Sequence, residues 1–82
     1  MKTTKLTSLN QLAVGECGEV CTLPENIDIR HRLMSLGLVT GTLITVVNVS
    51  LAGDPKAYFF RGAVIALRNR DAETVYVKKV GD

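Results

Sequence analysis

The stretch that decides the fold is "RLMSLGLVTGT", residues 32–42, in which two glycines follow a helical pattern. Gly37 comes directly after the last apolar residue of that pattern, where a helix commonly ends in a left-handed residue without a Cβ atom. Leu38 can then fold back onto the last helical turn. Gly41 gives a second sharp change of direction, and a β-branched run begins at Thr42. The stretch therefore predicts a helix end, a tight corner and a strand start, with structural roles for both glycines.

The residues before this corner predict a short amphipathic helix. Asn26 is placed to cap its N-terminus, because its side-chain oxygen can accept a hydrogen bond from a free N–H of the first turn. Ile29, Leu33 and Leu36 fall at positions i, i+4 and i+7, on one helical face. A helix of about ten residues is unstable alone in water, so we expect it to dock on the rest of the protein.

Short segments rich in β-branched and aromatic residues alternate with turn signals along the chain. Asp54 and Pro55 form one such turn, in which proline fixes φ, and residues 69–72 form another. Five short strands predict a small barrel or sandwich, in which closure of the sheet would remove exposed edges. The helix, inserted after the first strand, would cover one end. The predicted strands are 19–23, 42–50, 57–61, 63–68 and 74–80.

The composition fits a single small domain over residues 1–82, with 46% hydrophobic residues and no tryptophan. The core is therefore expected to be mainly aliphatic. A net charge of +2 is weak for a nucleic-acid-binding protein, which usually carries a strong basic patch. The longest strongly apolar run is 63–67, whereas a membrane-spanning helix needs about 20 residues. With no apolar segment behind Met1, we expect a cytoplasmic protein without membrane insertion.

Few residues offer reactive chemistry. On a strand, Cys17 and Cys21 would lie roughly 13 Å apart, beyond the roughly 7 Å that a disulfide tolerates. Together with His31 they supply three potential metal ligands, fewer than the four of a structural zinc site. Nothing in the sequence places a third group to orient Cys17 or His31 for catalysis. The sequence predicts no metal site, no cofactor and no catalytic residue, and so no enzyme.

The order of several short motifs resembles the FeoA family of small bacterial ferrous iron transport proteins. The resemblance covers roughly residues 7 to 80. The motifs that carry it are "RLMSLGL" at 32–38, Gly-Thr at 41–42, "GDP" at 53–55, "ALR" at 66–68 and Asp-Ala at 71–72. The family commonly has proline before the glycine of the corner, where this chain has Thr40, which leaves φ less restricted.

The resemblance implies an SH3-like β-barrel and a function. FeoA proteins are regarded as cytoplasmic accessory proteins that bind and modulate FeoB, the membrane ferrous iron transporter with a GTPase domain. The same barrel occurs as the C-terminal domain of DtxR-like metal-dependent repressors. As a free-standing chain, this protein would lack the DNA-binding and dimerisation domains of such a repressor. The leading hypothesis is therefore an interaction module for an FeoB-type transporter.

A docking surface for an acidic partner is expected around the helix and the fourth strand. Leu36 and Leu38 suit the core better than a contact, although an exposed leucine at this corner would anchor a partner. One alternative is a nucleic-acid-binding barrel in which Arg61 extends a basic stripe; another is a metal-responsive regulatory module. Free edge strands would also permit weak self-association. The candidate partner-binding residues are Arg30, Arg32, Leu36, Leu38, Arg68 and Arg70.

Overall fold

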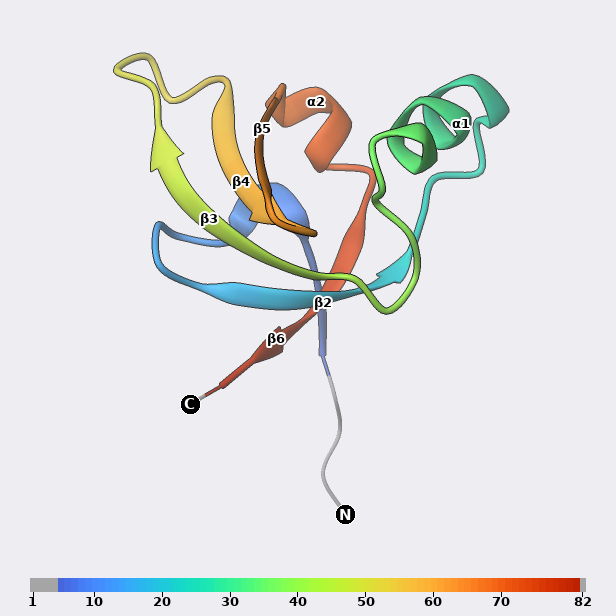
Figure 1. Cartoon of the computed structure of the whole chain (residues 1–82), viewed down its shortest axis with the longest axis horizontal. Coiled ribbons are helices and arrows are strands. Elements are labelled where there is room, and N and C mark those ends of the chain that lie inside the picture. The colour runs from blue at the N-terminus through green and yellow to red at the C-terminus, as the bar shows by residue number, and fades with distance from the viewer. Residues whose placement is uncertain (1–4, 82) are drawn as a thin grey trace.

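The protein is built around one antiparallel sheet, seen in a computed structural model that describes residues 5–81 (Figure 1). Its six strands lie in the order β1-β6-β2-β3-β4-β5, which confirms the mainly β prediction. The strands are β1 Leu6–Ser8, β2 Cys17–Thr22, β3 Leu43–Val49, β4 Lys56–Phe60, β5 Ala63–Leu67 and β6 Tyr76–Val80; the helices are α1 Ile27–Ser35, α2 Asn69–Ala72 and the 3-10 helix η1 Leu9–Gln11. Neither α1 nor α2, within the part of the chain described, has the length and apolar character needed to cross a membrane.

Two elements differ from the sequence prediction. Strand β1 was not foreseen, because three residues are too few to show an alternating pattern; it pairs with β6 from Leu6↔Lys78 to Ser8↔Tyr76. Helix α1 therefore follows the second strand rather than the first. The predicted turn at residues 69–72 is the four-residue helix α2.

The sheet curls around the core without closing. Register shifts in β2 and β3 mark irregularities of the kind that bend a strand, and Figure 1 shows both helices on the side toward which the sheet curls. The outermost strands, β1 and β5, do not pair with each other. Instead η1, which follows β1, packs against α2, which follows β5. The prediction that closure removes the sheet edges is therefore wrong, and β5 keeps a free edge.

The core follows the predicted alternation along the later strands. Tyr58 and Phe60 of β4 are buried and Phe59 between them is exposed. Val75 and Val77 are likewise fully buried on either side of the exposed Tyr76. The helix contributes Leu33 to the core, with Ile29 packed at its margin, as its periodicity predicts.

Candidate partner-binding surface

The end of α1 is a complete Schellman motif. Gly37 has φ +99°, and its N–H donates to the carbonyl of Met34 at 2.9 Å. The N–H of Leu38 donates to the carbonyl of Leu33 at 3.1 Å. Both leucines are fully buried in the core. This is the hydrophobic contact that accompanies the motif, so the chain leaves the helix with its backbone groups satisfied.

The second half of the corner joins α1 to the sheet. Gly41 has φ +93°, and its N–H donates to the carbonyl of Val20 in β2 at 2.8 Å. The Thr42 hydroxyl accepts from the N–H of Val39 at 3.2 Å and donates to the carbonyl of Gly37 at 3.4 Å. Thr42 is only 7% exposed. Its buried hydroxyl therefore spans the corner that the two glycines create.

The structure separates the two leucines that the sequence placed in the partner-binding set. Leu38 is fully buried, so its inclusion as a contact residue is wrong. Leu36 is 39% exposed at the C-cap of α1, although its spacing had placed it on the core stripe. It leaves the core because the helix is ending there. Met34, two residues earlier on α1, is also exposed.

An ion pair joins the two helices that carry the predicted arginines. Arg32 Nη2 of α1 lies 3.0 Å from Asp71 Oδ2 of α2. Arg30 is exposed on α1, while Arg68 and Arg70 are exposed at the start of α2. We call Arg30, Arg68 and Arg70 the arginine surface; Arg32 lies beside it but is already paired. The Arg32–Asp71 ion pair thus links α1 to α2, two segments 39 residues apart in the sequence.

Arg61 lies close to the end of α1, although the sequence placed it only in the basic stripe of the nucleic-acid-binding alternative. It lies between β4 and β5 with φ +52°, followed by Gly62 at φ +81°. Two such residues make the turn favoured in tight hairpins. Its Cδ lies 2.9 Å from the point that a Cβ on Gly37 would occupy. An Arg-Gly pair between two apolar runs indicates a hairpin, but no local pattern predicts the contact with Gly37, which is tertiary.

The Gly-Asp-Pro loop holds the start of α2. Asp54 Oδ1 accepts from the N–H of Asn69 at 2.9 Å, and Asn69 Nδ2 donates to the carbonyl of Gly53 at 2.9 Å. The Asp54–Pro55 peptide bond is cis. A carboxylate at a helix N-terminus satisfies a free N–H and complements the helix dipole. Asp54 thereby fixes the orientation of the helix that carries Arg70.

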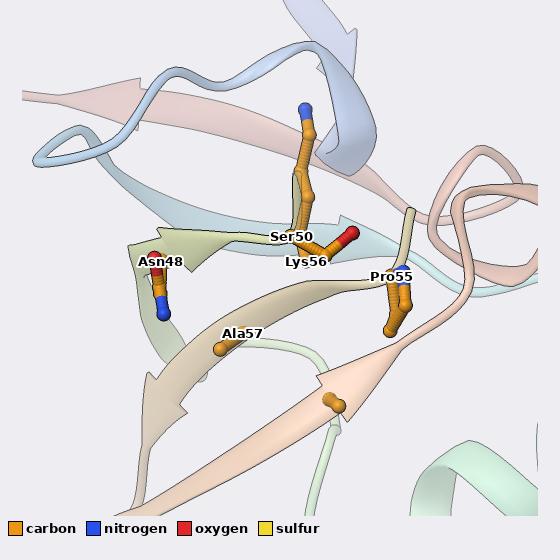
Figure 2. Close-up of a pocket in the computed structure, with 6 residues that line it drawn as sticks. Asn48, Ser50, Pro55, Lys56 and Ala57 are labelled. Atoms are coloured by element: carbon orange, nitrogen blue, oxygen red, sulfur yellow. The ribbon is translucent and has the colours of Figure 1, made fainter. Parts of the chain in front are cut away.

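A shallow pocket lies on the outer face of β3, β4 and β5 (Figure 2). Its volume is about 190 Å³. Lys56 runs away from it, and its Nζ donates to the carbonyls of Asn10 and Leu12. The Ser50 hydroxyl accepts from the N–H of Asp54 at 3.0 Å. The lining residues are Asn48, Ser50, Pro55, Lys56, Ala57 and Ala66.

The potential metal ligands do not gather. Among residues 5–81, no group of three or more histidine, cysteine, aspartate or glutamate side chains is placed to hold an ion. Cys17 and Cys21 are free, half-buried thiols on β2, and His31 is exposed on α1. The structure instead joins α1 to α2 through the Arg32–Asp71 ion pair, and it places Cδ of Arg61, in the β4–β5 turn, close to Gly37.

Comparison with known families identifies the chain. The family model of the FeoA domain matches residues 7–79. The chain belongs to the FeoA family. A search of curated proteins finds no match, whereas several solved FeoA structures are similar to this one.

The similar FeoA structures extend over nearly the whole domain. The FeoA-like protein of Clostridium acetobutylicum is 28% identical, with TM-score 0.91 over 98% of this chain and 93% of that one. FeoA of Chlorobium tepidum is 31% identical, with TM-score 0.85 over 92% of this chain and 71% of that one. FeoA of Stenotrophomonas maltophilia, solved with zinc and described as an SH3 domain protein, is 26% identical, with TM-score 0.75 over 94% and 91%. The SH3-like fold expected from the resemblance is therefore confirmed.

The structure of T. acidophilum IdeR shares the fold at 20% identity. The match has TM-score 0.83 and covers 98% of this chain but 37% of that one. At this identity the similarity concerns the fold alone. The FeoA family, in contrast, links this chain to ferrous iron transport.

Proposed function

We propose that this protein is a cytoplasmic accessory protein that binds and modulates an FeoB-type ferrous iron transporter. The observation that carries the proposal is the FeoA domain, which spans residues 7–79. The Stenotrophomonas relative is described as a candidate ferrous iron transport activating factor. A module that acts on a transporter needs a binding surface rather than a reaction centre of its own. We therefore propose that this protein is a non-catalytic partner of the transporter.

The arginine surface and Leu36 are the proposed contacts. Arginine recognises carboxylates through two parallel hydrogen bonds, so exposed arginines on adjoining helices suit an acidic patch on the transporter. Within residues 5–81, none of Arg30, Arg68 and Arg70 forms an ion pair. Leu36, which is 39% exposed at the C-cap of the helix that carries Arg30, supplies an apolar anchor. Such a combination of anchor and charged rim is typical of a protein interface.

Calorimetric titration with the purified cytoplasmic part of the transporter tests the proposal. We expect saturable one-to-one binding with a Kd below about 50 µM. The Arg70→Glu variant should bind roughly tenfold more weakly, because it places a carboxylate opposite an acidic patch. Lys5→Glu is the matched control, since it makes the same charge change before β1, on the other edge of the sheet. It should bind within about twofold of the unmodified protein, apart from a small long-range effect.

Two results would contradict the proposal. Absence of binding at this concentration, both with and without guanine nucleotide, would remove the transporter as the partner. Equal loss of affinity in the Arg70 and Lys5 variants would show that the arginine surface is not a specific contact.

A further inference from the structure

Strand β5 presents an unprotected edge. It is the last strand of the sheet, and it pairs with β4 alone. Its sequence, "AVIAL" at residues 63–67, contains no charged residue and no proline. Natural proteins usually protect an edge strand with a charge, a proline, a bulge or a covering segment. Within residues 5–81, no backbone hydrogen bond from a turn or loop reaches this strand.

The hairpin register shows which backbone groups face the free side. Phe60 and Ala63 flank a two-residue turn and pair with each other, and the ladder continues through Tyr58↔Ile65. The residues that flank such a turn exchange both hydrogen bonds, and bonded and non-bonded pairs then alternate along the ladder. The N–H and C=O groups of Val64 and Ala66 therefore point away from β4. They form a short row of two donors and two acceptors that an added strand can pair with.

The outer face beside this edge is apolar and partly hollow. Val64 is 62% exposed and its cross-strand neighbour Phe59 is 44% exposed. The next pair, Ala57 and Ala66, has small side chains, and both residues line the pocket (Figure 2). An added strand would place one side chain beside Val64 and another above the hollow at Ala66. Such pockets for alternate side chains give specificity in strand addition.

Charge at the two ends of β5 favours one kind of occupant. Arg61 precedes the strand and Arg68 follows it, and neither forms an ion pair within the described chain. Consider a dimer in which Val64 of one copy pairs with Ala66 of a second copy. Gly62 of the first copy would then pair with Arg68 of the second, so Arg61 of the first copy and this Arg68 would be neighbours. Like charges at this spacing disfavour the symmetric dimer. A strand with carboxylates at both ends meets opposite charges instead.

We infer that the free edge of β5 binds an extended, acid-flanked apolar segment of a protein partner by antiparallel strand addition. Val64 and Ala66 supply the backbone contacts, Phe59 and the pocket supply the apolar ones, and Arg61 and Arg68 hold the carboxylates. The inference rests on the proposed function, because it specifies how part of the transporter would be recognised.

Substitution of Val64 tests the backbone contact without breaking the ladder. Val64→Pro removes only an N–H that points away from β4, and proline is tolerated at such edge positions. Val64→Thr keeps the N–H and the β-branched shape, and is the matched control. Both variants are first checked for a native-like amide spectrum and thermal midpoint.

Two probes are used with each variant. The first is the cytoplasmic part of the transporter. The second is a nine-residue synthetic peptide with Leu and Val at its fourth and sixth positions, Asp at its second and eighth, and Thr elsewhere, titrated to about 1 mM. A peptide with Lys replacing both Asp is the charge control.

The expected result is binding of both probes to the unmodified protein and to Val64→Thr, with at least tenfold weaker binding by Val64→Pro. The amides of Val64 and Ala66 should become protected from hydrogen exchange in the complex, and the Lys peptide should bind at least fivefold more weakly.

Each failure has a distinct meaning. Transporter binding that is equal in Val64→Pro and the unmodified protein would overturn the strand-addition inference and leave the proposed function standing. Lack of transporter binding by the unmodified protein would overturn both. Equal losses in the Pro and Thr variants would overturn the backbone contact. Concentration-dependent protection of Val64 and Ala66 without a probe would assign the edge to a second copy instead.

Discussion

At the scale of single residues, Gly37 serves the corner through two separate properties. Its φ of +99° lies in the region that residues with a Cβ rarely adopt. A Cβ at this position would also lie 2.9 Å from Cδ of Arg61. The glycine thus both ends α1 and lets the β4–β5 hairpin approach the helix. Only the first property is visible in the sequence, because the second depends on a residue 24 positions later.

Replacing Gly37 should reveal both properties. Gly37→Ala is expected to lower the free energy of unfolding by about 2 kcal/mol, from backbone strain and the crowding of Arg61. Gly53→Ala is the matched control, because Gly53 has φ +85° but nothing within 4 Å of its Cβ position. It should cost about 1 kcal/mol from strain alone. Urea denaturation measures both values, and equal losses would contradict the contribution of the Arg61 contact.

Tyr58 carries a second residue-scale feature, a buried hydroxyl. The side chain is fully buried, and its hydroxyl has no hydrogen-bond partner among residues 5–81. Burial, with a smaller effect of the Asp54 charge, raises the pKa of Tyr58 to about 12. Because the charged form of Tyr58 is disfavoured in the folded protein, this group does not change stability below pH 10 and lowers it as the pH rises toward 12.

Tyr58→Phe is therefore expected to be stabilising. At neutral pH the gain should be about 1 kcal/mol, because an unpaired buried polar group is removed. Between pH 10 and 12 the unmodified protein should lose on the order of 2 kcal/mol that the variant keeps. Thermal unfolding as a function of pH measures the difference. A variant that is less stable than the unmodified protein at pH 7 would show that the hydroxyl has a favourable partner.

At the scale of elements, α1 depends on its cap more than on its length. It has nine residues, too few for independent stability. Asn26 Oδ1 accepts from the N–H groups of Asp28 at 3.0 Å and Ile29 at 3.1 Å. These two bonds hold the first turn of the helix together, and the buried Leu33 packs its second half against the core.

Removal of this cap should loosen the helix. Asn26→Ala is expected to cost about 1 kcal/mol of unfolding free energy, because two backbone N–H groups lose their acceptor. Asn26→Asp keeps the acceptor and should remain within a few tenths of a kcal/mol. Hydrogen exchange of the first-turn amides, with urea denaturation, checks both variants. A similar loss in both would mean that the side-chain bonds contribute little.

Elements with a strong local signal could be predicted from the sequence. The cap at Asn26, the helix end at Gly37 and the alternation around Phe59 are each encoded within a few neighbouring residues. Strand β1 and helix α2 have three and four residues, so their conformation depends on β6 and on the Asp54 loop rather than on local pattern. Gly18 lies in β2, where a Cβ would come within 2.9 Å of Cγ2 of Val77.

At the scale of the whole molecule, the free edge of β5 is a consequence of how the sheet curls. Local patterns predicted most of the strands, but not that the sheet would stay open between β1 and β5, with η1 packed against α2. The ion pair between Arg32 and Asp71 likewise depends on which segments meet in space. The arginines of the candidate surface were therefore recognisable from the sequence as charges, and only the fold shows which of them share a surface and which leucine is buried.

We propose that this FeoA-family domain acts by binding a ferrous iron transporter through α1, α2 and the adjoining hairpin. An amide-resolved titration of the isotope-labelled protein with the transporter's cytoplasmic part tests it most directly. We expect saturable changes at Arg30, Leu36, Val64 and Arg70, with β1 and the outer end of β6 unaffected. A spectrum that does not change, or changes centred on β1 and β6, would contradict it.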